Sequence, residues 1–216
     1  MKRLVLSVMI VCASTLGLSV AGCGKGVNKW QKQILAEDNP DQRREAVLEL
    51  MDKRLGKSDG AVRLFAQLAE RDEDPTVRSA AVQALGETDN QLAVPALARV
   101  LDNEADAQVR RDAAVSLGKV RGPEAVRALL SRLREDRADE VRTACGRSLG
   151  EYPYPGVVQA LVAALLSEDF STTFAAQRSL EKLTGKSFES SRAWQEWLDK
   201  TGEPFATSGV SSEAAE

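Results

Sequence analysis

The chain has 216 residues, of which 43% are apolar and 28% charged, and its formal net charge is −3. This apolar content is sufficient for a folded core, and the low aromatic share of 5% beside abundant alanine and leucine favours packed helices over sheet. The sequence contains no histidine, which excludes histidine acid–base catalysis and histidine metal ligation, and a mildly acidic chain gives no electrostatic reason to expect nucleic acid. The composition therefore predicts a soluble, helical, non-enzymatic protein without a cofactor.

The first 22 residues have the parts of an export signal. Lys2 and Arg3 precede an uncharged stretch, LVLSVMIVCASTLGLSV (residues 4–20), which small residues follow. The tetrapeptide VAGC, which ends at Cys23, is similar to the lipobox of bacterial lipoproteins. That resemblance implies a signal peptide over residues 1–22, lipidation of Cys23 and attachment to a membrane through several acyl chains.

Two other interpretations of the N-terminal segment stay open. Residues 19–21 (Ser-Val-Ala) also fit a cleavage site that would release a soluble secreted protein. An uncleaved anchor is the other, although the apolar stretch is near the lower limit for a membrane span. The position of Cys23 favours the lipoprotein, with a flexible tether over residues 23–28 and a first capping helix that carries Trp30 and Ile34.

A ten-residue segment recurs at intervals of 32 residues. The copies are VRSAAVQALG (residues 77–86), VRRDAAVSLG (109–118) and VRTACGRSLG (141–150). In the first copy, apolar and small residues step by i, i+4, i+7 and i+8 from Val77 to Leu85, which is one face of an α-helix. The glycine that ends each copy, such as Gly86, is expected to turn left-handed and stop the helix.

A second apolar segment alternates with these copies. It reads AVRLF, AVPAL, AVRAL and VVQAL at residues 61–65, 93–97, 125–129 and 157–161, again 32 residues apart. The two patterns advance together, so the repeating unit is a pair of helices, and weaker copies around Arg43 and Ala176 bring the count to about five pairs. One pair cannot bury its apolar face alone, whereas stacked pairs share a continuous core. We therefore expect an all-α, right-handed α-solenoid over residues 29–188.

The repeats also resemble a known family. Asp74–Gly86 and Asp106–Gly118 each place an aspartate before Val-Arg and end in Leu-Gly, as HEAT repeats of the short bacterial type do, a type also found in phycocyanobilin lyases. The resemblance extends over about residues 39–185. The resemblance implies the solenoid fold and a role in scaffolding or partner recognition on its inner surface. It does not identify the partner.

An arginine follows the first valine of each copy: Arg78, Arg110 and Arg142. These arginines could form a ladder for an extended acidic ligand. However, each lies at a helix start with an aspartate nearby in the sequence. The aspartates are Asp74, Asp106 and Asp139. We therefore interpret the arginines as structural residues that pair along the stack while their stems pack against the next repeat.

Positions one and five after the repeat arginine should face away from the core, on the concave side that second helices line in HEAT-like solenoids. Gln83, Arg111, Arg147 and Arg178 occupy such positions. One hypothesis is that they form a basic strip on an acidic protein, suited to an acidic peptide or a glycan. The alternative is an ordinary solvated helix face.

The C-terminal segment has its own helical pattern. Ser190 or Ser191 can cap a helix in which Trp194, Trp197 and Leu198 are spaced i, i+3 and i+4. We expect residues 189–205 to form a capping helix over the last repeat. Residues 206–216 are polar, have no periodic apolar face and are expected to be a disordered tail.

Several patterns that can signal chemistry do not do so here. The triplet GKS at residues 56–58 and 185–187 lacks the upstream glycine and strand of a phosphate-binding loop. The acidic clusters at residues 72–74 and 135–140 lie at helix starts, where carboxylates cap helices, so no metal site is expected. Cys145 occupies a slot that alanine fills in the sister repeats and is expected to be a buried small residue.

These inferences lead to one expected function and two alternatives. We expect a lipid-anchored HEAT-repeat scaffold that mediates protein–protein interactions in the bacterial cell envelope, on the periplasmic or the surface side. Its partners would be other envelope proteins and, through the lipid on Cys23, a membrane. The alternatives are a ligand- or chromophore-handling protein related to HEAT-type bilin lyases, and a glycan- or matrix-binding envelope component.

Overall fold

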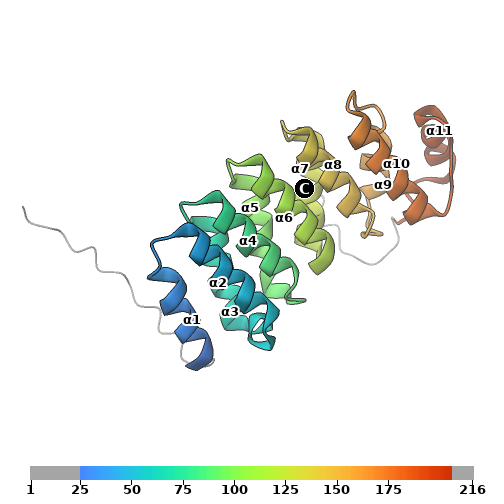
Figure 1. Ribbon diagram of the computed structural model, residues 1–216. Coiled ribbons are helices and arrows are strands. Elements are labelled where there is room, and N and C mark those ends of the chain that lie inside the picture. The colour runs from blue at the N-terminus through green and yellow to red at the C-terminus, as the bar shows by residue number, and fades with distance from the viewer. Residues whose placement is uncertain (1–24, 206–216) are drawn as a thin grey trace, which may run out of the picture.

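The computed structural model describes residues 25–205. The expected signal peptide (residues 1–22), Cys23 and the expected tail (residues 206–216) lie outside this range. The described residues form eleven α-helices and no strand, and the helices follow one another along an elongated array (Figure 1). No helix among residues 25–205 is both long and apolar enough to cross a membrane.

The first ten helices form five consecutive pairs. The pairs are α1 (Lys25–Leu35) with α2 (Pro40–Asp52), α3 (Asp59–Arg71) with α4 (Pro75–Gly86), α5 (Val94–Asn103) with α6 (Ala107–Val120), α7 (Pro123–Glu135) with α8 (Asp139–Leu149), and α9 (Val157–Ala164) with α10 (Phe170–Thr184). Short 3-10 helices η1 (Arg54–Lys57) and η2 (Gln91–Ala93) precede α3 and α5. Second helices pack on second helices and first helices on first helices, which confirms the predicted all-α solenoid.

Helix α11 (Ser191–Thr201) packs against α9 at the far end of the array (Figure 1). Its Ser190 cap accepts a hydrogen bond from the backbone of Ala193. Trp194 is fully buried, and its indole Nε1 donates to the side-chain oxygen of Gln177 on α10 over 2.8 Å. The aromatic helix therefore covers the apolar surface of the last pair.

Helix α1 begins at Lys25, which differs from the expected tether over residues 23–28. Val27 is only 3% exposed, and it lies beside Gly60 at the start of α3. Burial of this side chain stabilises residues 25–28 as helix, because an extended tether would leave it in water.

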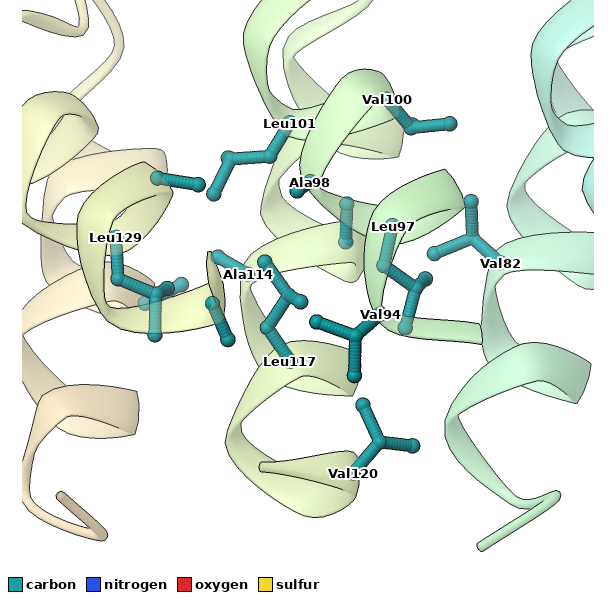
Figure 2. Packing of buried hydrophobic residues seen from close by; sticks show 14 of the residues in the cluster. Val82, Val94, Leu97, Ala98, Val100, Leu101, Ala114, Leu117, Val120 and Leu129 are labelled. Atoms are coloured by element: carbon teal, nitrogen blue, oxygen red, sulfur yellow. The ribbon is translucent and has the colours of Figure 1, made fainter. Parts of the chain in front are cut away.

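Alternating small and large residues fill the interior of the stack. Ala81, Ala113, Cys145 and Ala176 are fully buried at equivalent positions of four second helices. Leucines from neighbouring helices are also fully buried, and Figure 2 shows Leu97, Leu117 and Leu129 among the apolar side chains between α5, α6 and α7. Small residues on the second helices allow the helices to approach closely, and the leucines fill the remaining space.

The glycines that end the ten-residue segment do not turn left-handed, so that expectation was wrong. Gly86 is the last residue of α4, Gly118 lies inside α6, and Gly150 has φ −62°. A Cβ on these glycines would lie 2.6, 2.8 and 2.7 Å from the hydroxyl of a serine in the next second helix. The serines are Ser116, Ser148 and Ser179. Glycine is therefore present because two helices meet there, not because the chain turns.

Candidate docking surface

Exposed side chains of the five second helices recur every four residues, about one helical turn, and form the second-helix face. They stand one, five and nine positions after the repeat arginine, for which Arg43 is the reference in the first repeat and Thr173 in the last, and all are exposed or half-buried. The first row is Arg44, Ser79, Arg111, Thr143 and Phe174. The second row is Leu48, Gln83, Val115, Arg147 and Arg178. The third row is Asp52, Glu87, Lys119, Glu151 and Lys182.

The four residues expected to form one basic strip line two separate hollows on this face. The α4–α6 hollow, of about 470 Å³, is bordered by Met51, Asp52 and Lys57 before α4 and is lined by Gln83, Glu87, Arg111, Asp112, Val115, Ser116 and Lys119. The α8–α10 hollow, of about 530 Å³, is lined by Arg147, Glu151, Phe174, Arg178, Glu181 and Lys182. The structure thus brings Gln83 together with Arg111, and Arg147 together with Arg178.

Acidic groups offset the basic character of the α4–α6 hollow. Asp112 accepts hydrogen bonds from Ser79 over 2.5 Å and from Gln83 over 3.3 Å, and it lies 3.5 Å from the guanidinium of Arg111. In the third row, Lys119 pairs with Glu87 at 2.5 Å. Arg111 and Lys119 therefore each have a carboxylate beside them, and the basic strip is weaker in this half than the sequence suggested.

The α8–α10 hollow retains more basic character. Arg147 is exposed and forms no ion pair among residues 25–205. Arg178 is 69% exposed, and its only ion pair in this range is with Glu181, one turn along its own helix, at 3.0 Å. Lys182 pairs with Glu151, which also accepts from Arg121. Two guanidinium groups at the same level of neighbouring helices thus stay accessible to a ligand.

The repeat arginines lie at the starts of the second helices, away from both hollows. Arg78 binds Glu104, with Nε to Oε2 at 2.8 Å and Nη2 to Oε1 at 3.0 Å, and its Nη1 donates to the carbonyls of Asp72 and Glu73. Arg110 binds Asp136 in the same way, and Arg43 binds Asp72. Each arginine therefore ties the end of its own first helix to the end of the next first helix.

The partners of two arginines differ from the aspartates that the sequence suggested. Asp74 and Asp106 accept hydrogen bonds from backbone amides at the starts of α4 and α6, so they cap these helices. The partners Glu104 and Asp136 lie 26 residues after their arginines, in the next repeat. Sequence reasoning missed these pairs, although Asp72, Glu104 and Asp136 recur with the same 32-residue period and were therefore recognisable.

The fourth arginine interrupts this series of pairs. Arg142 binds Asp139 of its own helix, and its Nη1 donates to the carbonyl of Asp136 over 2.8 Å. The 32-residue period places Glu168 where the next acid would stand, but Glu168 is exposed. Among the described residues, side-chain pairs of this type link the first four repeats and not the fourth to the fifth.

The carboxylates of these pairs are held in the charged form. Burial alone would raise the pKa of Asp136, but the Arg110 guanidinium and the backbone N–H of Ala138 outweigh it and lower that pKa. Burial would likewise raise the pKa of Glu104, but the Arg78 guanidinium and the backbone N–H of Asp106 outweigh it and lower that pKa. Hydrogen bonds to the ionised carboxylate favour that form.

Cys145 is the one free thiol among residues 25–205, and it is fully buried. Burial raises the pKa of its thiol well above the usual value, so the thiolate needed for nucleophilic chemistry is disfavoured. Within the same residues, no group of three or more cysteine and acidic side chains is arranged to hold a metal ion.

An exposed aromatic pair was missed by sequence reasoning. Phe170 and Phe174 are 78% and 55% exposed, and their rings are stacked with centroids 6.1 Å apart. Phe174 lies in the first row, at the edge of the α8–α10 hollow. A large apolar residue at a position expected to face solvent was the signal that could have identified it.

Comparison with known proteins agrees with this architecture. The chain is similar to a chain in the complex of CpcE and CpcF of phycocyanin lyase from Nostoc sp. PCC7120, with 23% identity, a TM-score of 0.64, and coverage of 84% of this chain and 72% of that chain. It is also similar to a crystal structure of an engineered protein, with 21% identity, a TM-score of 0.52, and coverage of 74% and 80%. At these identities the likeness concerns the fold alone. No curated protein gives a significant sequence match.

The sequence also matches a model of HEAT repeats three times, over residues 27–118, 62–150 and 126–194. These overlapping matches follow the helix pairs from α1 to the start of α11. Because they cover residues 27–194, which is more than half of the chain, the protein belongs to the HEAT-repeat family.

Proposed function

We propose that this protein is a non-enzymatic adaptor of the bacterial cell envelope that binds a partner protein on the second-helix face. The proposal is carried by one observation: side chains that the stack needs are buried or paired between repeats, whereas the α8–α10 hollow presents Arg147 and Arg178 to solvent. Exposed arginines and aromatic residues around a hollow are the residue types that dominate protein interfaces.

The size of the second-helix face suits such a role. Neighbouring packed helices lie ~10 Å apart and rise ~1.5 Å per residue, so five second helices span about 40 Å by 20 Å. A standard protein–protein interface buries about 800 Å² on each partner. The face is therefore large enough for one folded partner or for an extended segment that crosses the repeats.

The membrane attachment rests on the sequence. Cys23 stands two residues before α1 begins, at Lys25. A diacylglyceryl group and an acyl chain on Cys23 would hold the first repeat close to the bilayer, and two or more chains suffice for stable anchoring. The second-helix face would then be presented beside a membrane, where envelope proteins can reach it.

The test is affinity capture from detergent-solubilised membranes with a C-terminal tag. We compare the wild type, Cys23→Ala, and the triple variant Arg111→Glu/Arg147→Glu/Arg178→Glu. The matched control reverses the charge at three exposed arginines on first helices: Arg63→Glu/Arg127→Glu/Arg134→Glu. We expect the wild type and the control to retain one reproducible envelope partner, the triple variant to lose it, and Cys23→Ala to leave the membrane fraction.

Two outcomes would contradict the proposal. If the wild type captures no reproducible partner, or if the triple variant captures it as well as the control does, the second-helix face is not the docking surface. If Cys23→Ala fractionates with membranes as the wild type does, the lipid anchor is wrong.

A chromophore- or ligand-handling role is the alternative, and its support is the likeness of fold to a chain of the phycocyanin lyase complex over 84% of this chain. A bound chromophore would give the purified protein absorption in the visible range. The position of Cys145 in the core argues against covalent attachment through that thiol. Glycan binding would be recognised by retention of the wild type, and not of the triple variant, on a glycan matrix.

A further inference from the structure

The last repeat carries an apolar patch that its fold does not require. Phe170 is the first residue of α10, Phe174 lies one turn later, and Leu166, 75% exposed, precedes the helix. Single apolar residues are common on protein surfaces, but two stacked aromatic rings with a leucine close by in the sequence are not. The other four repeats place arginine, serine or threonine at the position of Phe174. The stack therefore tolerates polar residues there.

The chain's own aromatic residues are engaged elsewhere. Trp194 is buried against Gln177 and Phe188, with ring centroids of Trp194 and Phe188 4.7 Å apart. Helix α11 packs against α9. The rings of Phe170 and Phe174 thus remain exposed although the cap of the stack is in place.

The charges of the α8–α10 hollow that remain free are basic, whereas the acids Glu168 and Asp169 precede Phe170 at the start of α10. The carboxylate of Glu181 accepts hydrogen bonds from Gln177 at 2.9 Å, from Ser187 at 3.0 Å and from Arg178 at 3.0 Å. Glu151 forms ion pairs with Lys182 and Arg121. The acids that line the α8–α10 hollow are therefore engaged by the chain's own donors, while Arg147 forms no ion pair among the described residues and Arg178 is largely exposed.

We infer that the α8–α10 hollow binds an acidic peptide segment that carries a large apolar side chain. The apolar side chain packs on the stacked rings of Phe170 and Phe174, and carboxylates of the segment bind Arg147 and Arg178. Guanidinium groups bind carboxylates through two parallel hydrogen bonds, and aromatic rings add favourable contact with a further ring. The inference rests on the proposed function, because it names the chemistry of the partner at that same face.

The probes are three fluorescein-labelled heptapeptides, and the measurement is fluorescence anisotropy with the full chain in detergent micelles. The first peptide has acidic residues on both sides of one tryptophan. The second replaces its acids with lysine, and the third replaces its tryptophan with alanine. We expect the first peptide to bind roughly tenfold more tightly than either of the others, because the second peptide lacks the carboxylates and the third lacks the aromatic ring.

Two variants test the two halves of the site, each with a matched control. Arg147→Glu/Arg178→Glu and Phe170→Ser/Phe174→Ser should each weaken the first peptide about tenfold. The controls are Arg63→Glu/Arg127→Glu, with the same change in charge on first helices, and Leu92→Ser, a side chain that is 50% exposed on η2. Neither control should change the affinity, and unchanged melting curves would show that the variants fold.

The inference is overturned if the first peptide has no advantage, or if the controls weaken it as much as the hollow variants do. It is also overturned if Phe170→Ser/Phe174→Ser converts a dimer to a monomer in analytical ultracentrifugation, because the patch then binds a second copy. The proposed function is judged separately by membrane capture. Suppose that Phe170→Ser/Phe174→Ser still captures the partner and the triple arginine variant does not. The adaptor role would then stand, and only the inference about the acidic, apolar peptide would be wrong.

Discussion

The guanidinium of Arg110 binds the carboxylate of Asp136 in the next repeat through two parallel hydrogen bonds, Nε to Oδ2 at 2.8 Å and Nη2 to Oδ1 at 2.9 Å. The side chains are 13% and 1% exposed, so the pair lies largely out of water. Asp136 also accepts from the backbone N–H of Ala138, which leaves neither Oδ atom without a partner. The pair joins the ends of two first helices and fixes the register between repeats.

Removal of the carboxylate from this pair should destabilise the whole stack. Asp136→Ala leaves the Arg110 guanidinium partly buried without its counter-charge, and such a loss costs about 3 kcal/mol in the free energy of unfolding. The control is Asp139→Ala, which removes the partner of Arg142 within one helix, where an exposed pair contributes less than about 1 kcal/mol. Urea unfolding followed by circular dichroism measures both. Equal losses in the two variants would show that the inter-repeat pair has no special role.

The same pairs make the stability depend on acid. The pKa of Asp136 and that of Glu104 are lowered in the folded state, so each pair contributes stability above the unfolded carboxyl values near ~4. That contribution is lost as the pH falls through the lower, folded pKa values. We expect the urea midpoint to be flat from pH 7 to 5 and to fall below about pH 4.

Asp136→Asn identifies how much of that acid sensitivity comes from one group. The amide cannot titrate, so the variant should be less stable than the wild type at pH 7 but should lose less of its remaining stability on acidification. Urea midpoints at pH 7, 5 and 3 give the two slopes. Parallel curves for wild type and variant would exclude Asp136 as a source of the pH dependence.

The helix pairs were predictable because stacking leaves a period in the sequence. A residue such as Ala81 or Leu85 meets the same kind of neighbour in every repeat, so the pattern returns after 32 residues. The partner of Arg78 was not predictable from proximity in the chain, because Asp74 is closer in sequence and Glu104 is closer in space. The 32-residue recurrence of Asp72, Glu104 and Asp136 was the sequence signal for these partners, and the stacking register shows which acid lies opposite each arginine.

The candidate surface was predictable only in part for the same reason. The positions of Arg147 and Arg178 follow from helical spacing, and the structure places them beside one hollow. The carboxylate of Asp112, which compensates Arg111, is in the adjacent position of the same helix, and helical spacing does not predict a contact between adjacent positions. Phe174 was missed, although it stands at a position where helical spacing predicts that side chains face away from the core, and it is 55% exposed.

The cap on the last repeat should depend on one tryptophan. Trp194 is fully buried, and it donates to Gln177 and packs edge-on against Phe188. Truncation to alanine leaves a cavity, and Trp194→Ala should cost about 3–5 kcal/mol in the free energy of unfolding. Trp197→Ala, at a half-buried position on the same helix, should cost less. Urea unfolding compares the two, and a smaller loss for Trp194→Ala would mean that the cap is not held by this residue.

The close contact between second helices predicts a steric effect that can be rescued. A Cβ on Gly86 would lie 2.6 Å from the Oγ of Ser116 and 3.1 Å from its Cα, and the hydroxyl is held by a hydrogen bond to the carbonyl of Val82. Gly86→Ala should therefore destabilise the protein by about 1–3 kcal/mol, although alanine is the better helix former by up to about 1 kcal/mol.

Three further variants separate the steric effect from helix propensity. Gly60→Ala in α3 is the control, because its Cβ would meet Val27 at 3.4 Å, an ordinary contact, and it should be neutral or mildly stabilising. Gly86→Ala/Ser116→Gly removes the obstructing hydroxymethyl group and should recover part of the lost stability, since residues in contact are coupled in a double-mutant cycle. Urea unfolding of the wild type, Gly86→Ala, Ser116→Gly and the double variant gives the coupling energy. If the double variant is as unstable as the sum of the single ones, the glycine is not required by its approach to Ser116, and its role would have to lie within its own helix.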